Sequence, residues 1–440
     1  MAVRSAAAVE LAGGRVRGRP GAYLGIPYAR ARRFGAPEPV APWAGELDAT
    51  EPGLPAPQPK RPISEFAHGP LPPSSEDCLT LNVWTPSGGD GPWPVLVWAI
   101  GGGWTIGWAG SGVYDGAALA EAARVVVVNF NYRLGSLGWL YVDGGNFGLL
   151  DHVAVLAWVR DNIAAFGGDP GRVTLGGQSA GAANVADLLV SPLGEGLFAR
   201  AILHSPPLPE AANDPERAAR WARALAARVA ALGDTPDRGV AARGGPADPF
   251  GALNAAPADQ IVAAHEALLA DPEWRGTRGA AWPVRDGRVL PASPLERPDA
   301  RLDVPVLVGT TRDEATFLFR TGGRDAPDEQ VERVTRELFT APTQRWAGER
   351  AAAGGRVHLF RLDHPSPDPR LGALHTIDVP LLFGTFRTSE VGRHYVADDE
   401  PTRAVSAAMQ RAWAAFLHGG EPWPQKQELC TVGSHEHIPC

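Results

Sequence analysis

A serine flanked by two glycines, in Gly177-Gln178-Ser179-Ala180-Gly181, is the feature that most constrains the fold of this chain. The apolar run Val173-Thr174-Leu175 precedes it, and residues 182–189 have the composition of a helix. A sharp turn between a strand and a helix forces its serine into a strained conformation that exposes the hydroxyl, and side chains at the glycine positions would clash. Because 52 of the 440 residues are Gly, the pattern also arises by chance. Ser179 is therefore a candidate nucleophile, and other residues of the chain must provide the evidence for this role.

Composition indicates a compact, single-sheet protein. A length of 440 residues suggests about three average domains, but large α/β folds keep one sheet over such a length. Apolar residues make up 44% and charged residues 20%, which excludes a disordered chain. The net charge of −8 is spread without long runs of one sign, so neither nucleic acid nor an anionic membrane surface is an expected partner. We expect one large domain over residues 1–424 that binds a small molecule, as a monomer or a small homo-oligomer.

Targeting and cysteine signals favour the cytoplasm. No stretch approaches the ~18 to 20 apolar residues that span a bilayer, and residues 1–20 lack the apolar segment of a secretory signal. Of three cysteines, Cys78 stands alone and the other two lie in the last residues, so no disulfide framework is visible. We expect a cytoplasmic protein without membrane contact.

Apolar patterning predicts strands that alternate with helices. Buried strands are predicted at 95–100, 125–130, 201–204, 304–308 and 357–360, and helical faces at 149–163, 221–232 and 405–416. This order predicts a mostly parallel central sheet with helices on both faces. Residues 206–300 have helical patterns and few strand signals, which predicts a cap over the sheet. The Pro-rich segment 51–73 predicts an irregular surface loop.

A serine nucleophile needs a base, a carboxylate that orients the base, and N–H donors for the oxyanion. Gly101-Gly102-Gly103 follows a predicted strand and could supply backbone donors, as could the N–H of Ala180. Asp313 and Glu314 follow the predicted strand 304–308, where active sites of open α/β sheets lie. Eleven histidines compete for the base, and these residues alone do not decide among them.

Motifs along the chain carry a wider resemblance, from about Gly13 to Pro424. They are GIPYA at 25–29, EDCLTLN at 76–82, NYRLG at 131–135, GNFGLLD at 145–151, FGGDP at 166–170 and GALHTIDVP at 372–380. Together they resemble the type B carboxylesterase family, which includes bacterial para-nitrobenzyl esterases and cholinesterases. The resemblance implies the α/β-hydrolase fold and a triad of Ser179, Glu314 and His375. It also implies an oxyanion hole of Gly102, Gly103 and Ala180, and no metal or cofactor.

The same resemblance implies supporting roles. Asp313 and Asp378 help to hold their loops, and Ser205 either supports the catalytic acid or bonds to nearby backbone. Trp104 and Trp108 line the substrate pocket or are plain core. Gln178 is a further expected residue of the substrate pocket; it stands where cholinesterases carry a glutamate, which disfavours a choline ester as the preferred substrate.

Two departures from the family pattern lead to further expectations. Ile100 replaces a His or Tyr before the three glycines, so we expect the glycine loop to be held mainly by packing. Residues 425–440 fall outside the resemblance and hold two of the three cysteines with His435 and His437. We expect this tail to be unstructured or non-native rather than a metal site.

The resulting prediction is a serine carboxylesterase that hydrolyses short to medium acyl or aryl esters through an acyl-enzyme. Carbamates, lactones or thioesters are alternative substrates for the same machinery. A non-catalytic binding homologue is a further alternative, against which the intact triad speaks.

Overall fold

A nine-stranded sheet forms the centre of the protein. The computed structural model describes residues 8–89, 91–142, 144–210, 213–233, 250–274, 282–321, 325–423 and 430–433. The sheet order is β14-β13-β12-β11-β10-β8-β9-β7-β3. Its strands are β3 (Ala22–Pro27), β7 (Thr80–Trp84), β8 (Trp93–Ala99), β9 (Val126–Phe130), β10 (Gly168–Gln178), β11 (Arg200–His204), β12 (Val306–Thr311), β13 (Val357–Leu362) and β14 (Cys430–Val432). Only β7 pairs antiparallel, with β9 and β3, so the expected mostly parallel sheet is confirmed.

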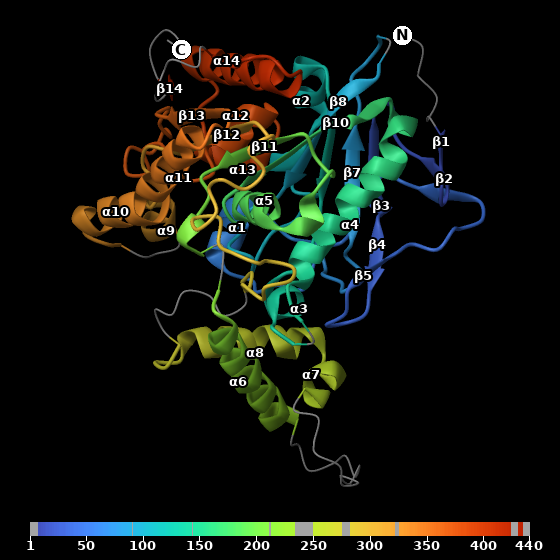
Figure 1. Ribbon diagram of the computed structural model, residues 1–440, viewed down its shortest axis with the longest axis vertical. Helices are drawn as coiled ribbons and strands as arrows, with labels where there is room; N and C mark the ends of the chain where they lie inside the picture. The colour runs from blue at the N-terminus through green and yellow to red at the C-terminus, as the bar shows by residue number, and fades with distance from the viewer. Residues whose placement is uncertain are drawn as a thin grey trace.

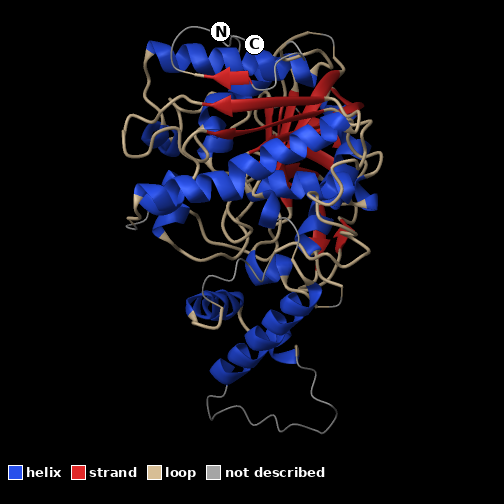
Figure 2. Cartoon of the chain, turned by 60° about the vertical axis from the view of Figure 1, so that its left-hand side comes forward, coloured by secondary structure: helices blue, strands red, loops and turns tan. Residues whose placement is uncertain are grey.

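Helices cover the sheet on both sides (Figure 2). Around it lie α1 (Pro62–His68), α2 (Ala117–Ala123), α3 (Gly135–Trp139), α4 (Phe147–Asn162), α5 (Ala180–Val190), α9 (Thr316–Arg320), α10 (Asp328–Val334), α11 (Ala341–Ala352), α12 (Asp378–Phe383), α13 (Glu390–Tyr395) and α14 (Glu400–Leu417). A π-helical segment, η5 (Thr335–Thr340), joins α10 to α11. Short 3₁₀ turns are η1 (Gly112–Tyr114), η2 (Ile163–Phe166), η3 (Pro192–Gly194) and η4 (Leu208–Glu210).

Burial explains why the central strands lack polar alternation. Every residue of β9 and all but the first of β8 are buried, because helices pack on both faces of the sheet. A strand covered on both faces selects a continuous run of apolar, often β-branched residues. Strands β8, β10 and β12 run in the same direction, so their carboxyl ends lie on the same side of the sheet. The segments that follow these ends form the site described below.

The cap helices pack in a second hydrophobic cluster, separate from the main core, that also includes residues of α3 and α4. The cap contains α6 (Pro215–Gly233), α7 (Gly251–Ala255) and α8 (Ala258–Ala270), which lie together at one end of the molecule (Figure 1). Asp214 caps α6 by accepting a hydrogen bond from the N–H of Arg217 at 2.9 Å. Buried side chains at the predicted helical spacing belong to this cluster, among them Trp221, Leu225 and Val229.

Several polar contacts connect the cap to the body, including those of Arg33 with the backbone carbonyls of Leu253 and Ala256. Arg61, just before α1, forms a bidentate ion pair with Glu266 of α8. Ser136 of α3 bonds Nδ1 of His265 at 2.7 Å. The last two contacts join the cap to residues beside the cavity described below.

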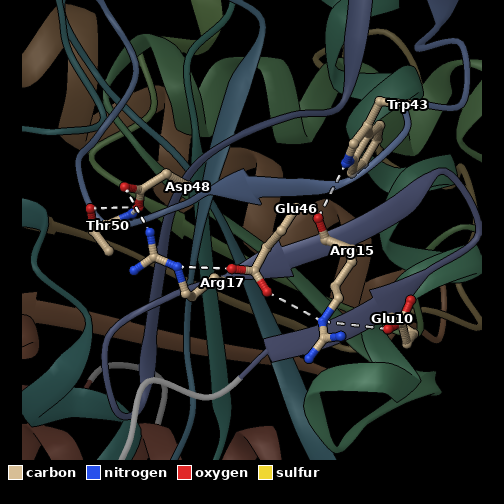
Figure 3. A network of polar contacts seen from close by, with 7 residues as sticks. All are labelled: Glu10, Arg15, Arg17, Trp43, Glu46, Asp48 and Thr50. Atoms are coloured by element: carbon tan, nitrogen blue, oxygen red, sulfur yellow. Dashed lines mark hydrogen bonds and ion pairs between the residues drawn. The ribbon is translucent and has the colours of Figure 1, made fainter.

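A small sheet near the N-terminus is held by exposed charges (Figure 3). It contains β1 (Ala8–Leu11), β2 (Gly14–Arg17) and β6 (Glu46–Asp48), while β4 (Ala29–Ala31) pairs with β5 (Pro37–Pro39). Arg17 contacts Glu46 at 2.9 Å and Asp48 at 3.1 Å. Because these side chains are partly or largely exposed, solvent screens the ion pairs, and they add little to stability.

Two segments differ from expectation. Residues 51–73 contain α1, so this stretch is not wholly an irregular loop. Within the expected unstructured tail, Cys430–Val432 form β14, with Cys430 and Val432 fully or almost fully buried. Their side chains pack into the core at the edge of the sheet. A stretch of three residues is too short for an alternating pattern to predict a strand. Residues 425–429 and 434–440 of the tail, including His435 and His437, lie outside the described residues. No helix in the described part of the chain is long and apolar enough to cross a membrane.

Candidate active site

Ser179 occupies a strained turn between β10 and α5. Its backbone has φ 57° and ψ −126°, a sparsely populated conformation for a residue with a side chain. A Cβ at Gly181 would lie 2.2 Å from the carbonyl oxygen of Ala99, and one at Gly177 would lie 2.6 Å from the backbone of Gly181. The flanking glycines are therefore required by close backbone approach. Ser179 is partly exposed and lines a cavity.

Glu314 and His375 form a buried hydrogen-bonded pair. Glu314 follows β12, and His375 lies in the loop before α12. Nδ1 of His375 lies 2.5 Å from Oε2 of Glu314, and both side chains are almost completely buried. The N–H of Thr311 donates to Oε1 of Glu314 at 2.8 Å, which fixes the carboxylate. This arrangement orients the imidazole with Nε2 directed away from the acid.

The neighbouring acid, Asp313, has a different partner. Its Oδ2 accepts a hydrogen bond from the N–H of Ala373 at 2.8 Å, and its own N–H donates to the carbonyl of Ala373 at 2.9 Å. A Cβ at Gly372 would lie 2.2 Å from Oδ2 of Asp313, so glycine is needed there. Asp313 thus ties the loop that carries His375 to the end of β12, the loop-holding contact expected for it.

Asp378 belongs to a second buried His–carboxylate pair. It contacts Nδ1 of His204, and the indole N–H of Trp413 donates to Nε2 of His204 at 2.8 Å. All three side chains are buried. Since both ring nitrogens of His204 are occupied, this pair joins β11, α12 and α14 and does not offer a free base.

Gln178, directly before the candidate nucleophile, contacts the imidazole. Its side-chain amide nitrogen donates to Nε2 of His375 at 3.0 Å, and its Oε1 is buried without a partner. Among the described residues, no hydrogen bond joins the hydroxyl of Ser179 to His375. The ring nitrogen of His375 that is not bonded to Glu314 therefore already accepts a hydrogen bond, from Gln178.

The three glycines after β8 form a tight loop beside Ser179. Gly102 has φ 127° and Gly103 has φ 60°, and a Cβ at Gly102 would lie 2.0 Å from the carbonyl oxygen of Ile106. No hydrogen bond in the described part of the chain uses the N–H of Gly102, Gly103 or Ala180. Ala180 begins α5, where first-turn N–H groups have no acceptor within the helix. These N–H groups remain available to a ligand.

Hydrogen bonds hold this loop, contrary to the expectation drawn from Ile100. The hydroxyl of Tyr132 donates to the carbonyl oxygen of Ile100 at 2.9 Å. Gln58 both donates to and accepts from the backbone of Gly107, at 2.8 Å each. Distant side chains thus supply polar contacts that the Ile100 side chain cannot, in addition to the packing of Ile100 in the core. Comparing Ile100 with the family pattern could not reveal Tyr132 and Gln58, because both lie far from the glycine loop in the sequence.

The cavity has a volume of about 430 Å³. Trp104 and Gln178 line it as predicted, together with Gly102, Gly103, Ser179 and His375. Trp108 is not among the lining residues, because its indole N–H donates to the carbonyl of Gly53 at 2.7 Å. Ser205 is buried at the end of β11 with φ 51°, and its N–H donates to Gly309. In the described chain its hydroxyl forms no hydrogen bond with Glu314.

Several lining residues had no sequence signal. Phe317 of α9 and Phe339 of η5 pack near the imidazole of His375, with ring centroids 5.7 and 4.9 Å away. Residues of α1 and Trp282, beside the cap, also line the cavity. Amphipathic periodicity could have suggested Phe339, but a π-helical turn shifts the face of a helix by part of a turn. Among the described residues, no group of three or more His, Cys, Asp or Glu is placed to hold a metal ion.

Comparisons with known proteins show the family and the fold of the chain. The model of the carboxylesterase family matches residues 5–335. The para-nitrobenzyl esterase of Bacillus subtilis (strain 168) is 33% identical over 92% of this chain and 89% of its own. The phenmedipham hydrolase of Pseudarthrobacter oxydans is 34% identical over 91% of this chain and 86% of its own. The solved structure of a thermophilic PNB esterase matches with TM-score 0.84 and 32% identity, over 96% of this chain and 92% of that one. The chain therefore has the α/β-hydrolase fold and belongs to the carboxylesterase family of carboxylic ester hydrolases.

Proposed function

We propose that this chain hydrolyses short to medium acyl or aryl esters with Ser179 as nucleophile, His375 as base and Glu314 as the acid that orients the base. The observation that carries this proposal is the Glu314–His375 hydrogen bond beside a serine in a strained turn, all at one cavity. A serine hydroxyl is a weak nucleophile unless a neighbouring base removes its proton as it attacks.

In the proposed mechanism, Oγ of Ser179 attacks the ester carbonyl carbon while its proton passes to Nε2 of His375. Glu314 stabilises the imidazolium that forms, since Nδ1–H already donates to its carboxylate. The carbonyl oxygen becomes an oxyanion, which the N–H groups of Gly102, Gly103 and Ala180 receive. The imidazolium then gives its proton to the departing alcohol, and water attacks the acyl-enzyme through the same steps.

Gln178 adds a requirement to this sequence. Its amide donates to Nε2 of His375, so that bond has to break before the nitrogen can accept the proton of Ser179. The cavity wall is aromatic and apolar around the imidazole, through Phe317 and Phe339. Such a wall favours apolar acyl or aryl groups through burial of apolar surface.

The proposal is tested with p-nitrophenyl esters of graded acyl length and with the Ser179→Ala variant. We expect wild-type turnover on the shorter and medium esters and a loss in the variant on the order of 10⁶-fold. A fluorophosphonate probe should label Ser179, as mass spectrometry of the modified peptide can establish. Label on another residue would show that Ser179 is not the nucleophile, and a folded chain without hydrolysis of any ester would support the non-catalytic alternative.

A further inference from the structure

The glycine loop is held at both ends by one buried polar cluster, which we call the loop anchor and define as Tyr132, His152 and Asn184. Before the glycines, Tyr132 donates to the carbonyl of Ile100 at 2.9 Å. After them, the indole N–H of Trp104 donates to Oδ1 of Asn184 at 2.8 Å. The rings of Tyr132 and His152 pack together with centroids 4.6 Å apart.

Trp104 has a backbone that needs such support. Its φ of 58° is left-handed, a conformation that is unfavourable for a residue with a large side chain. Its carbonyl accepts a hydrogen bond from the N–H of Gly135 at 2.7 Å, and its ring packs against Trp282 at 5.1 Å. Because Trp104 directly follows Gly103, any relaxation of its backbone moves the N–H of that glycine.

The amide of Asn184 is fixed in orientation by its other partner. Its Nδ2 donates to Nε2 of His152 at 3.2 Å, and Nδ1 of His152 donates to the carbonyl of Gly148 at 2.7 Å. Burial lowers the pKa of His152 to about 4, so the ring is neutral near pH 7 and Nε2 remains an acceptor. With Nδ2 directed to His152, Oδ1 of Asn184 is left to accept from Trp104.

Asn184 also lies on the helix that carries the other oxyanion donor. It is four residues, about one turn, after Ala180 in α5, and its side chain is fully buried. A contact from Asn184 to Trp104 therefore sets the distance between the loop donors and the helix donor. Without this hydrogen bond, the glycine loop and the start of α5 would each be held only by their own neighbouring residues.

We propose that Asn184 is a positioning residue that, through the indole of Trp104, aligns Gly102 and Gly103 with Ala180 for the oxyanion of the transition state. This inference rests on the proposed function and adds to it. A hydrogen bond outside the cavity would thus act on turnover rather than on substrate affinity, because the oxyanion exists only after attack.

The test uses Trp104→Phe, Asn184→Ala and the double variant in the full-length chain. Loss of a whole oxyanion donor lowers turnover about 10²- to 10³-fold, so partial misalignment should lower kcat on p-nitrophenyl butyrate about 10-fold with KM within about 2-fold. Affinity for a trifluoromethyl ketone, whose hemiketal mimics the oxyanion, should fall by the same factor as kcat. The double variant should be no slower than the slower single variant, because both changes remove one shared contact.

Val185→Ala is the matched control, since Val185 is buried on the same helix beside Asn184. It should lower the melting temperature without changing kcat. If Asn184→Ala loses only stability, keeps kcat and keeps ketone affinity, the positioning role is wrong. Additive losses in the double variant would also overturn it.

Failure of the inference is separable from failure of the proposed function. If Ser179→Ala retains hydrolysis, the triad assignment fails whatever Asn184 does. If Ser179→Ala is inactive and Asn184→Ala is as fast as wild type, only the positioning role is lost.

Discussion

The side-chain amide of Gln178 donates a hydrogen bond to Nε2 of His375 at 3.0 Å. Nδ1 of the same ring donates to Glu314, so the neutral imidazole has a single acceptor nitrogen, and Gln178 occupies it. The proposed mechanism needs that nitrogen for the proton of Ser179. The resting state is therefore stabilised by a contact that the reaction has to break.

Gln178→Met should speed the acylation of Ser179. Methionine has a similar length but no N–H donor, so Nε2 of His375 is released. A neutral hydrogen bond contributes about 0.5 to 1.5 kcal/mol, which corresponds to a rise of up to about 10-fold in the labelling rate with a fluorophosphonate. Gln410→Met on α14 is the control, because Gln410 bonds the carbonyl of Leu382 outside the cavity. Slower labelling of the Gln178 variant would indicate that the amide holds the imidazole in its productive position.

The two adjacent acids after β12 should respond differently to loss of charge. Glu314→Gln should lower kcat by about 10⁴-fold, the cost of replacing the acid of a serine triad. Asp313→Asn keeps an oxygen for the N–H of Ala373 and should retain most activity with a lower melting temperature. Steady-state kinetics and thermal melts separate the two effects. A slow Asp313 variant beside an active Glu314 variant would transfer the orienting role to Asp313.

Ile100→His should not raise turnover, although the family pattern by itself suggests that it would. The carbonyl of residue 100 is already bonded by Tyr132, and the Ile100 side chain is 1% exposed. A buried imidazole without a partner costs about 1 to 3 kcal/mol, so the melting temperature should fall. Tyr132→Phe, which removes the hydroxyl, should lower kcat. Faster turnover of Ile100→His on p-nitrophenyl butyrate would show that the loop is underconstrained.

Acid should destabilise the fold through buried histidines. Burial lowers the pKa of His68, His152 and His265 to about 4, with a nearby Arg61 also lowering that of His265. The unfolded chain takes up these protons near pH 6.5. Their contribution to stability is therefore complete above pH 6.5 and is lost as the pH falls toward 4. Within this window each group should reduce the free energy of unfolding by about 1.4 kcal/mol per pH unit.

His68→Phe tests that prediction directly. Both ring nitrogens of His68 lack partners among the described residues, so phenylalanine removes an unsatisfied polar group and a proton-binding site together. The melting temperature should rise at pH 7 and rise further at pH 5. His394→Gln, at an exposed position on α13, should change neither. An equal acid dependence in wild type and His68→Phe would contradict the assignment.

Sequence patterns predicted elements that depend on local periodicity or on backbone geometry. The runs at 95–100 and 125–130 became β8 and β9, and the helical face at 221–232 became part of α6. The elbow at Ser179 followed from its glycines, whose side chains would clash with the backbone. Such features depend on residues that are close together in the sequence, so they can be predicted without a structure.

Contacts between distant residues were not predictable in this way. Gln178 and His375 are 197 positions apart, and Trp104 and Asn184 are 80 positions apart. Motifs drew attention to Gln178, His375 and Trp104 one at a time, but no local pattern shows which side chain each of them contacts. The π-helical turn that brings Phe339 to His375 depends on packing against the rest of the fold rather than on propensity.

The three residues of β14 cover part of the edge of β13, the strand that another copy of the molecule could otherwise pair with. They pair with Phe360, Arg361 and Leu362, the second half of β13, and among the described residues no strand pairs with the first half on that side. An open strand edge is a template for another chain, and a short final strand limits the length over which two molecules can join. A variant truncated before Cys430 would expose all of β13. We expect it to self-associate before its active site is affected.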